Sequence, residues 1–178
     1  MSDLVKLSQL LASRNEIDAE IARLLGRPAT VGALGEYVAA AIFDIELEAS
    51  AVAKGIDGRF RRGPLAGRTV DIKAYGKQEG LLDLPTHDQV PDFHLVLAGP
   101  KGGAVSSRGM TRPWVISSVY LFDTPGLIGE LRGRVKIGIA TNVASRFWEA
   151  AEVYPSSRSP HLLITNEQRA QLELFAPR

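Results

Sequence analysis

The sequence predicts an α/β (α+β) domain in which a mixed central β-sheet is flanked by helices and preceded by an N-terminal helical arm. Apolar residues at helical spacing dominate the first part of the chain, and β-branched runs separated by Gly- and Pro-rich turns follow. The connections between the later strands differ in length, which is typical of a mixed sheet. With 178 residues, 45% of them hydrophobic, a single domain is expected, with residues 1–28 as the arm and residues 29–178 as the core.

The arm is predicted to be helical over residues 3–26, because its apolar residues recur at spacings of three and four with charges between them. Asn15 fits an N-cap that divides the segment into two short helices, and Asp18 fits the matching capping box. Gly26 and Pro28 mark the end. Such an arm can serve as a dimerisation or docking element, or it can pack as a helical layer on the core. We expect the layer.

A second helix is predicted over residues 32–47, and it is apolar on nearly all sides, as expected for a helix buried between layers. Glu36 lies in its first turn. An acidic residue there is favoured by the helix macrodipole, which is a sufficient structural explanation. The alternative is that Glu36 projects toward acidic residues of the next segment, and the sequence leaves both interpretations open.

Residues 53–60 and 69–75 are predicted to be adjacent antiparallel strands joined by a turn rich in Gly and Pro. If the turn is centred on Pro64, Asp57 lies opposite Asp71, on the face that also carries Lys73. Two opposed carboxylates repel each other, whereas a bound divalent cation would reverse the sign of that interaction. A shift of one residue would move Asp57 to the other face, so the prediction depends on the register.

The pattern formed by Asp57, Asp71 fourteen positions later, and then Lys73 resembles the motif of the PD-(D/E)XK nuclease superfamily. The resemblance implies a restriction-endonuclease-like fold, with Asp57 and Asp71 as ligands of Mg²⁺ or Mn²⁺. It also implies that Glu36 is an outer or second-metal ligand and that Lys73 orients or activates the attacking water. The backbone carbonyl of Ile72 would be a further ligand.

This chain departs from the motif at two positions. Ile56 stands where the superfamily has its proline, and Asp71 stands where Glu is commoner. The surrounding order of helix, strand, turn and strand agrees with the implied fold.

Arg59, Arg61, Arg62 and Arg68 flank the predicted turn, Lys73 and Lys77 follow the hairpin, and the four arginines and Lys77 are expected to contact nucleic acid. Arg108 and Arg112 flank a later loop. Because the formal net charge is only +1, any contact with a polyanion must come from such a local patch. The structural alternative is a solvated polar turn.

The rest of the chain is predicted to alternate strands and helices. Strands are expected at 93–98, 114–122, 135–140 and 162–164, and helices at 125–131, 143–151 and from Thr165 or Asn166 to Leu174. Loops are expected at 80–92 and 99–109. His94 is expected to be a packed or edge-strand residue, and His87 is the histidine considered for a place near the site, although simple solvent exposure is favoured for it.

Several classes of protein are disfavoured. The absence of cysteine excludes a disulfide framework and a cysteine-bound zinc, and no Walker, Rossmann or G-x-S-x-G pattern is present. The start of the chain does not resemble a signal peptide and the apolar runs are too short to cross a bilayer, so a cytoplasmic protein without membrane contact is expected.

The sequence therefore predicts an Mg²⁺-dependent, endonuclease-like phosphodiesterase acting on nucleic acid, with DNA as the expected substrate. The alternative is a noncatalytic module of the same fold that binds nucleic acid or protein. A structural domain without a polyanion partner is the third interpretation, and a homodimer is left open.

Overall fold

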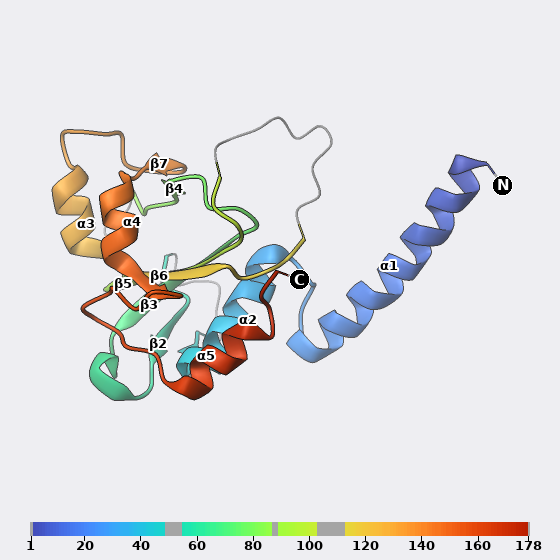
Figure 1. The fold of residues 1–178 in the computed structure, drawn as a ribbon, viewed down its shortest axis with the longest axis horizontal. Helices are drawn as coiled ribbons and strands as arrows, with labels where there is room; N and C mark the ends of the chain where they lie inside the picture. Colours follow the sequence, from blue (N-terminus) through green and yellow to red (C-terminus); the bar gives the residue numbers. More distant parts are fainter. Residues whose placement is uncertain (1, 49–54, 87–88, 103–112, 178) are drawn as a thin grey trace.

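The computed structural model describes residues 2–48, 55–86, 89–102 and 113–177 (Figure 1). Within these residues a six-stranded sheet has the order β1-β2-β3-β5-β6-β8. Its strands are β1 (Ile45–Leu47), β2 (Gly58–Phe60), β3 (Thr69–Tyr75), β5 (Phe93–Ala98), β6 (Ser118–Asp123) and β8 (Glu152–Tyr154). The β3–β5 pair is parallel and the other described pairs of this sheet are antiparallel, so the predicted mixed sheet is confirmed.

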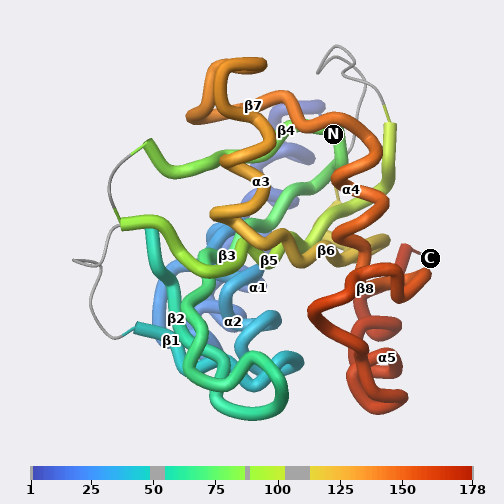
Figure 2. Tube along the Cα trace, turned by 90° about the vertical axis from the view of Figure 1, so that its left-hand side faces the viewer, coloured from blue at the N-terminus to red at the C-terminus, as the bar shows by residue number. Residues whose placement is uncertain are grey.

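Helices cover both faces of the sheet (Figures 1 and 2). On one face α2 (Val31–Phe43) and α5 (Asn166–Glu173) enclose an apolar cluster with β3 and β5. On the other face α3 (Thr124–Leu131), α4 (Ser145–Ala151) and the short ribbon of β4 (Leu81–Leu82) and β7 (Thr141–Asn142) enclose a second cluster. All six residues of β5 are buried, because alternate side chains enter the two clusters.

The arm is one continuous helix, α1 (Asp3–Leu25), and not the predicted pair of short helices. Ser2 caps its start and Gly26, with a φ of 71°, ends it. The expected helical layer is also wrong, because no residue of α1 is buried. Figure 1 shows α1 extending away from the body of the molecule. The apolar periodicity identified the helix but carried no information about which surface its apolar side would meet.

The second helix is shorter than predicted. It ends at Phe43 because Asp44 adopts a left-handed conformation with a φ of 53°. Residues 45–47 then form β1, which pairs with β2. The carboxylate of Asp44 accepts a hydrogen bond from Arg61 Nε at 2.8 Å, so the turn between α2 and β1 is tied to the end of β2.

The strand predicted at 135–140 does not form. Ala140 has a φ of 55°, and the hydroxyl of Thr141 accepts a hydrogen bond from the backbone N–H of Gly138, so these residues make a tight turn. The strand predicted at 162–164 is also absent from the described residues, where β8 pairs with β6 instead. The helix at 143–151 starts later, at Ser145. None of the described helices is long and apolar enough to span a membrane.

Candidate metal and nucleic-acid site

The hairpin of β2 and β3 has the register on which the sequence argument depended. Gly58 lies opposite Val70 and Arg59 lies opposite Thr69. Both pairs centre the turn on Pro64, and the regular pairing ends at Gly58. The backbone N–H of Asp57 donates to the carbonyl of Val70 at 2.9 Å, which keeps the two chains paired at this point. Asp57 therefore lies just outside the regular strand, which begins only at Gly58, and its carboxyl is a neighbour of the Asp71 carboxyl.

The carboxylate of Asp57 takes the place of a backbone acceptor where β2 stops pairing. Its Oδ2 accepts a hydrogen bond from the backbone N–H of Ile72 at 2.7 Å. In a strand the N–H and C=O of one residue point to the same side. The carbonyl of Ile72 is therefore directed toward the side of β3 that Asp57 occupies, as the resemblance implied for a further ligand.

Asp71 is almost completely buried, at 3% exposure, and both of its carboxylate oxygens face cationic or polar groups. Lys73 Nζ lies 2.7 Å from Oδ1. His94 Nε2 lies 3.1 Å from Oδ2, off the direction of a straight hydrogen bond. Burial raises the pKa of Asp71, but the imidazole of His94 and the ammonium of Lys73 outweigh it and hold the pKa below its usual value.

The pKa of Asp57 is shifted in the opposite direction. Burial is the largest cause that raises the pKa of Asp57 to about 7, and the neighbouring carboxyl of Asp71 raises it further. Glu36 adds a smaller repulsion, while the N–H of Ile72 lowers the pKa. The two aspartates therefore form an unlike pair, in which Asp71 is the permanent anion and Asp57 gains or loses a proton near neutral pH.

Glu36 lies near this pair but is held by another residue. Its Oε2 is 2.8 Å from Arg27, in the segment that joins α1 to α2. Its neighbour Gly35 sits directly against Ala74 of β3, which brings the first turn of α2 to the sheet. In the part of the chain that the structure describes, no three Asp, Glu or His side chains converge as a metal-binding group. Glu36 therefore influences Asp57 electrostatically without joining the pair.

His94 is the site residue that sequence reasoning missed. It is fully buried on β5, directly beside Asp71 in the parallel register, and its Nδ1 lies 2.8 Å from the Thr124 hydroxyl at the start of α3. The available signal was its position as the polar residue of the apolar run F-H-L-V-L-A, since a buried polar group needs a partner. His87, which was considered for the site, lies outside the described residues.

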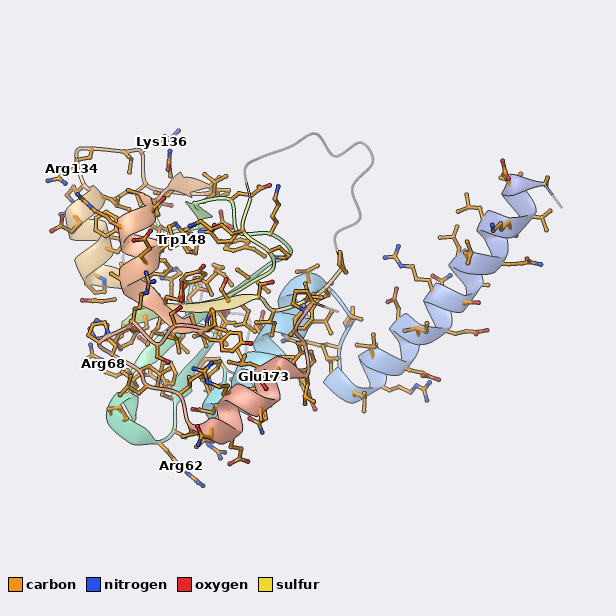
Figure 3. The ribbon with its side chains drawn as sticks, in the orientation of Figure 1. Arg62, Arg68, Arg134, Lys136, Trp148 and Glu173 are labelled. Atoms are coloured by element: carbon orange, nitrogen blue, oxygen red, sulfur yellow. The ribbon has the colours of Figure 1, made fainter. Side chains whose placement is uncertain are left out.

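The four arginines of the predicted basic cluster lie around the turn between β2 and β3, where Figure 3 shows Arg62 and Arg68, whereas Lys77 follows the other end of β3, beside Gly102. Acidic residues lie among these basic residues. Arg61 and Arg62 both pair with Asp44, at 2.8 and 3.3 Å. The other pairs are Arg59 with Glu48, Arg68 with Asp92 and Lys77 with Glu79. Arg108 and Arg112 lie outside the described residues. The basic residues are therefore paired with acidic ones and do not form a uniform positive patch.

Comparison of the chain with models of known protein families gives no match, and comparison with curated protein sequences gives none either.

Proposed function

We propose that this protein is an Mg²⁺-dependent phosphodiesterase that cleaves nucleic acid, with DNA as the first substrate to test. One observation carries the proposal. The carboxyl of Asp57 is a neighbour of the Asp71 carboxyl, which Lys73 also contacts, and this is the arrangement that the PD-(D/E)XK resemblance implies. Nucleic acid as substrate also fits the cytoplasmic location expected from the sequence.

The chemistry of the donor groups fits magnesium. Mg²⁺ prefers oxygen ligands and is commonly held by one or two carboxylates while it keeps several waters. Asp57 and Asp71 supply two carboxylates, and the carbonyl of Ile72 is directed to the same side of β3. Burial is the largest cause of the raised pKa of Asp57, and the neighbouring carboxyls of Asp71 and Glu36 add a like-charge repulsion that a cation would relieve. When bound, such an ion polarises a phosphate and lowers the pKa of a coordinated water.

Lys73 has two roles in this proposal. Its ammonium neutralises the buried Asp71 through the 2.7 Å contact, and its side chain keeps 28% exposure to solvent. A partly exposed ammonium beside a carboxylate pair can hold the oxygen of an attacking water or of the scissile phosphate. His94 lies on the other side of Asp71, with Nε2 3.1 Å from the carboxylate, and contributes to its electrostatic stabilisation from within the core.

The arginines around the turn would hold the phosphate backbone. Their ion pairs are exposed, and exposed ion pairs contribute only about 0.2–1 kcal/mol each. A phosphate can therefore displace Asp44 or Asp92 from its arginine at low cost.

A noncatalytic binding module is the second candidate, and a specific observation favours it. Both oxygens of Asp71 are engaged by Lys73 and His94 inside the protein, so this carboxylate is satisfied without a cation. On that interpretation Asp57 and Asp71 stabilise the hairpin, and only the arginines at the turn bind a partner.

A cleavage assay separates the two candidates. Labelled single-stranded DNA, double-stranded DNA and RNA are incubated with the protein and Mg²⁺ or Mn²⁺, and the products are resolved by size. We expect metal-dependent cleavage that Asp71→Ala abolishes and that Lys73→Ala lowers by about 10²-fold or more. Lys136→Ala and Glu130→Gln, at exposed positions, are the matched controls and should retain full activity.

Two results would decide against catalysis at this site. Absence of cleavage of every substrate with either metal would favour the binding module. Full activity in Asp71→Ala would place the chemistry elsewhere in the chain.

A further inference from the structure

Helix α1 has an apolar side that the described residues of the chain leave exposed. Among the described residues, large exposed apolar side chains concentrate on this helix: Leu4, Val5, Leu7, Leu10, Leu11, Ile17 and Leu24. The exposure of Leu10, Ile17 and Leu24 is 60, 57 and 75%. Helices in proteins gain most of their stability from packing an apolar side, and α1 projects away from the sheet without doing so (Figure 1).

The apolar residues of α1 follow the repeat of a helix pair. The positions at alternating spacings of three and four are Leu7, Leu10, Arg14, Ile17, Ile21 and Leu24. All but Arg14 are apolar, which is the pattern of the seam along which two helices associate. The helix has 23 residues and is about 35 Å long, so this seam runs over most of its length.

Arg14 determines the orientation in which two copies of this seam fit. In a parallel pair the two Arg14 side chains would meet in the same layer, and their like charges would repel. In an antiparallel pair with Leu7 opposite Leu24, Arg14 lies opposite Ile17. The same register places Leu10 opposite Ile21. Every pair of facing positions therefore contains at least one apolar residue.

The charges along α1 support the same orientation. Its first half, residues 3–14, contains Lys6 and Arg14 against Asp3, a net charge of +1. Its second half, residues 15–25, contains the three acids Glu16, Asp18 and Glu20 against Arg23, a net charge of −2. Antiparallel pairing brings the basic half of each helix beside the acidic half of the other.

We propose that α1 is a self-association arm that pairs antiparallel with α1 of a second copy of this chain. The inference rests on the exposure, repeat and charge of α1 and does not depend on catalysis at the hairpin.

The oligomeric state tests the proposal. Sedimentation velocity should show a concentration-dependent dimer for the wild type. Leu10→Glu combined with Ile17→Glu places charges in the seam and should raise the dissociation constant by at least about tenfold. Ala12→Glu combined with Ala19→Glu is the matched control, because it adds the same charge on the opposite side of the helix and should leave the dimer intact. Circular dichroism should show that each variant retains the fold, since none of the four positions is buried.

Cross-linking tests the orientation. The chain has no cysteine, so single cysteines can be introduced without background. An equimolar mixture of Leu7→Cys and Leu24→Cys should form a disulfide-linked heterodimer on oxidation. Leu7→Cys alone should cross-link much less, because its partner position in an antiparallel pair is Leu24.

Three outcomes would overturn the proposal. The first is a wild type that stays monomeric at roughly 100 μM, a concentration well above the dissociation constant of a specific dimer. The second is a dimer that survives the seam substitutions. The third is wild-type protein that binds phosphatidylcholine–phosphatidylglycerol vesicles while Leu10→Glu/Ile17→Glu does not, without any dimer, since this would assign α1 to a membrane surface.

Discussion

Asp57 is the residue through which pH acts most directly on the candidate site. Its pKa is raised from 3.8 to about 7, first by burial and then by the neighbouring Asp71 and Glu36. Between these two values the folded protein holds a proton that the unfolded chain has released. The free energy of unfolding should therefore fall as pH rises through this interval. We expect a loss on the order of 2 kcal/mol, after allowance for the solvent that reaches Asp57.

Urea denaturation at a series of pH values measures this effect. The loss should disappear in Asp57→Asn, whose amide oxygen can still accept the N–H of Ile72, and it should persist in the exposed control Glu130→Gln. The lowered pKa values of Asp71 and Asp92 act at lower pH, where they remove stability as the pH falls, so they do not mask it. A wild type and an Asp57→Asn variant with parallel stability curves would show that Asp57 titrates normally.

The carboxylate pair could be predicted from the sequence, but its surroundings could not. The Gly- and Pro-rich turn fixes a local register centred on Pro64, and Asp57, just beyond the paired residues, reaches β3 beside Asp71. The contact of Asp71 with His94 depends on the parallel pairing of β3 with β5, which joins segments separated by a long connection. Sequence alone therefore suggested that removing Asp71 would relieve a repulsion. The structure shows that its removal also leaves Lys73 and the buried His94 without their partner, so Asp71→Ala should be less stable.

At the scale of elements, the contact of α2 with β3 positions Glu36 beside the hairpin. Gly35 lies so close to Ala74 that a Cβ on Gly35 would overlap the side chain of Ala74. Gly35→Ala should therefore push α2 from the sheet and lower the free energy of unfolding by about 1–3 kcal/mol. Chemical denaturation measures the change.

Two variants control for this prediction. Gly32→Ala lies in the same helix with no atom within 4 Å of the added Cβ, so it should leave stability unchanged or raise it by up to about 1 kcal/mol. Ala74→Gly in the Gly35→Ala background should restore much of the loss, because it removes the atom with which the new Cβ collides. A Gly35→Ala protein as stable as the wild type would mean that α2 does not pack this closely.

The predicted boundaries of helices and strands were wrong where side chains stabilise turns that the apolar periodicity does not reveal. The apolar pattern of residues 32–47 continues through Ile45, but the left-handed Asp44, held by Arg61, ends the helix first. The alternation at 135–140 suggested a strand, whereas Thr141 and Asp83 hold residues 138–141 in a turn and leave Ile139 at the surface. The strand of residues 93–98 was predicted correctly because its continuous apolar run reflects burial on both faces.

At the scale of the whole molecule, charge is nearly balanced and acidic residues accompany the basic cluster. If the arginines at the turn hold phosphates, Arg61→Ala with Arg62→Ala should weaken DNA binding and lower the slope of log K against log salt by about 1–2. Fluorescence anisotropy at several salt concentrations measures the slope. Arg132→Ala with Arg134→Ala is the matched control, because Arg134 and Arg62 lie on opposite sides of the body of the molecule (Figure 3). Equal slopes for the two double variants would show that the arginines at the turn do not contact the DNA.

Isothermal titration calorimetry with Mn²⁺ measures whether Asp57 and Asp71 together bind a divalent cation, as proposed. At a pH of about 6 Asp57 is largely protonated, so binding of the ion should release a proton, which is detected by repeating the titration in buffers of different ionisation enthalpy. The wild type should bind one Mn²⁺ with release of a proton, and Asp57→Asn should bind at least about tenfold more weakly without that release. Identical binding by both proteins, or none by the wild type at millimolar Mn²⁺, would exclude a cation site formed by Asp57 and Asp71.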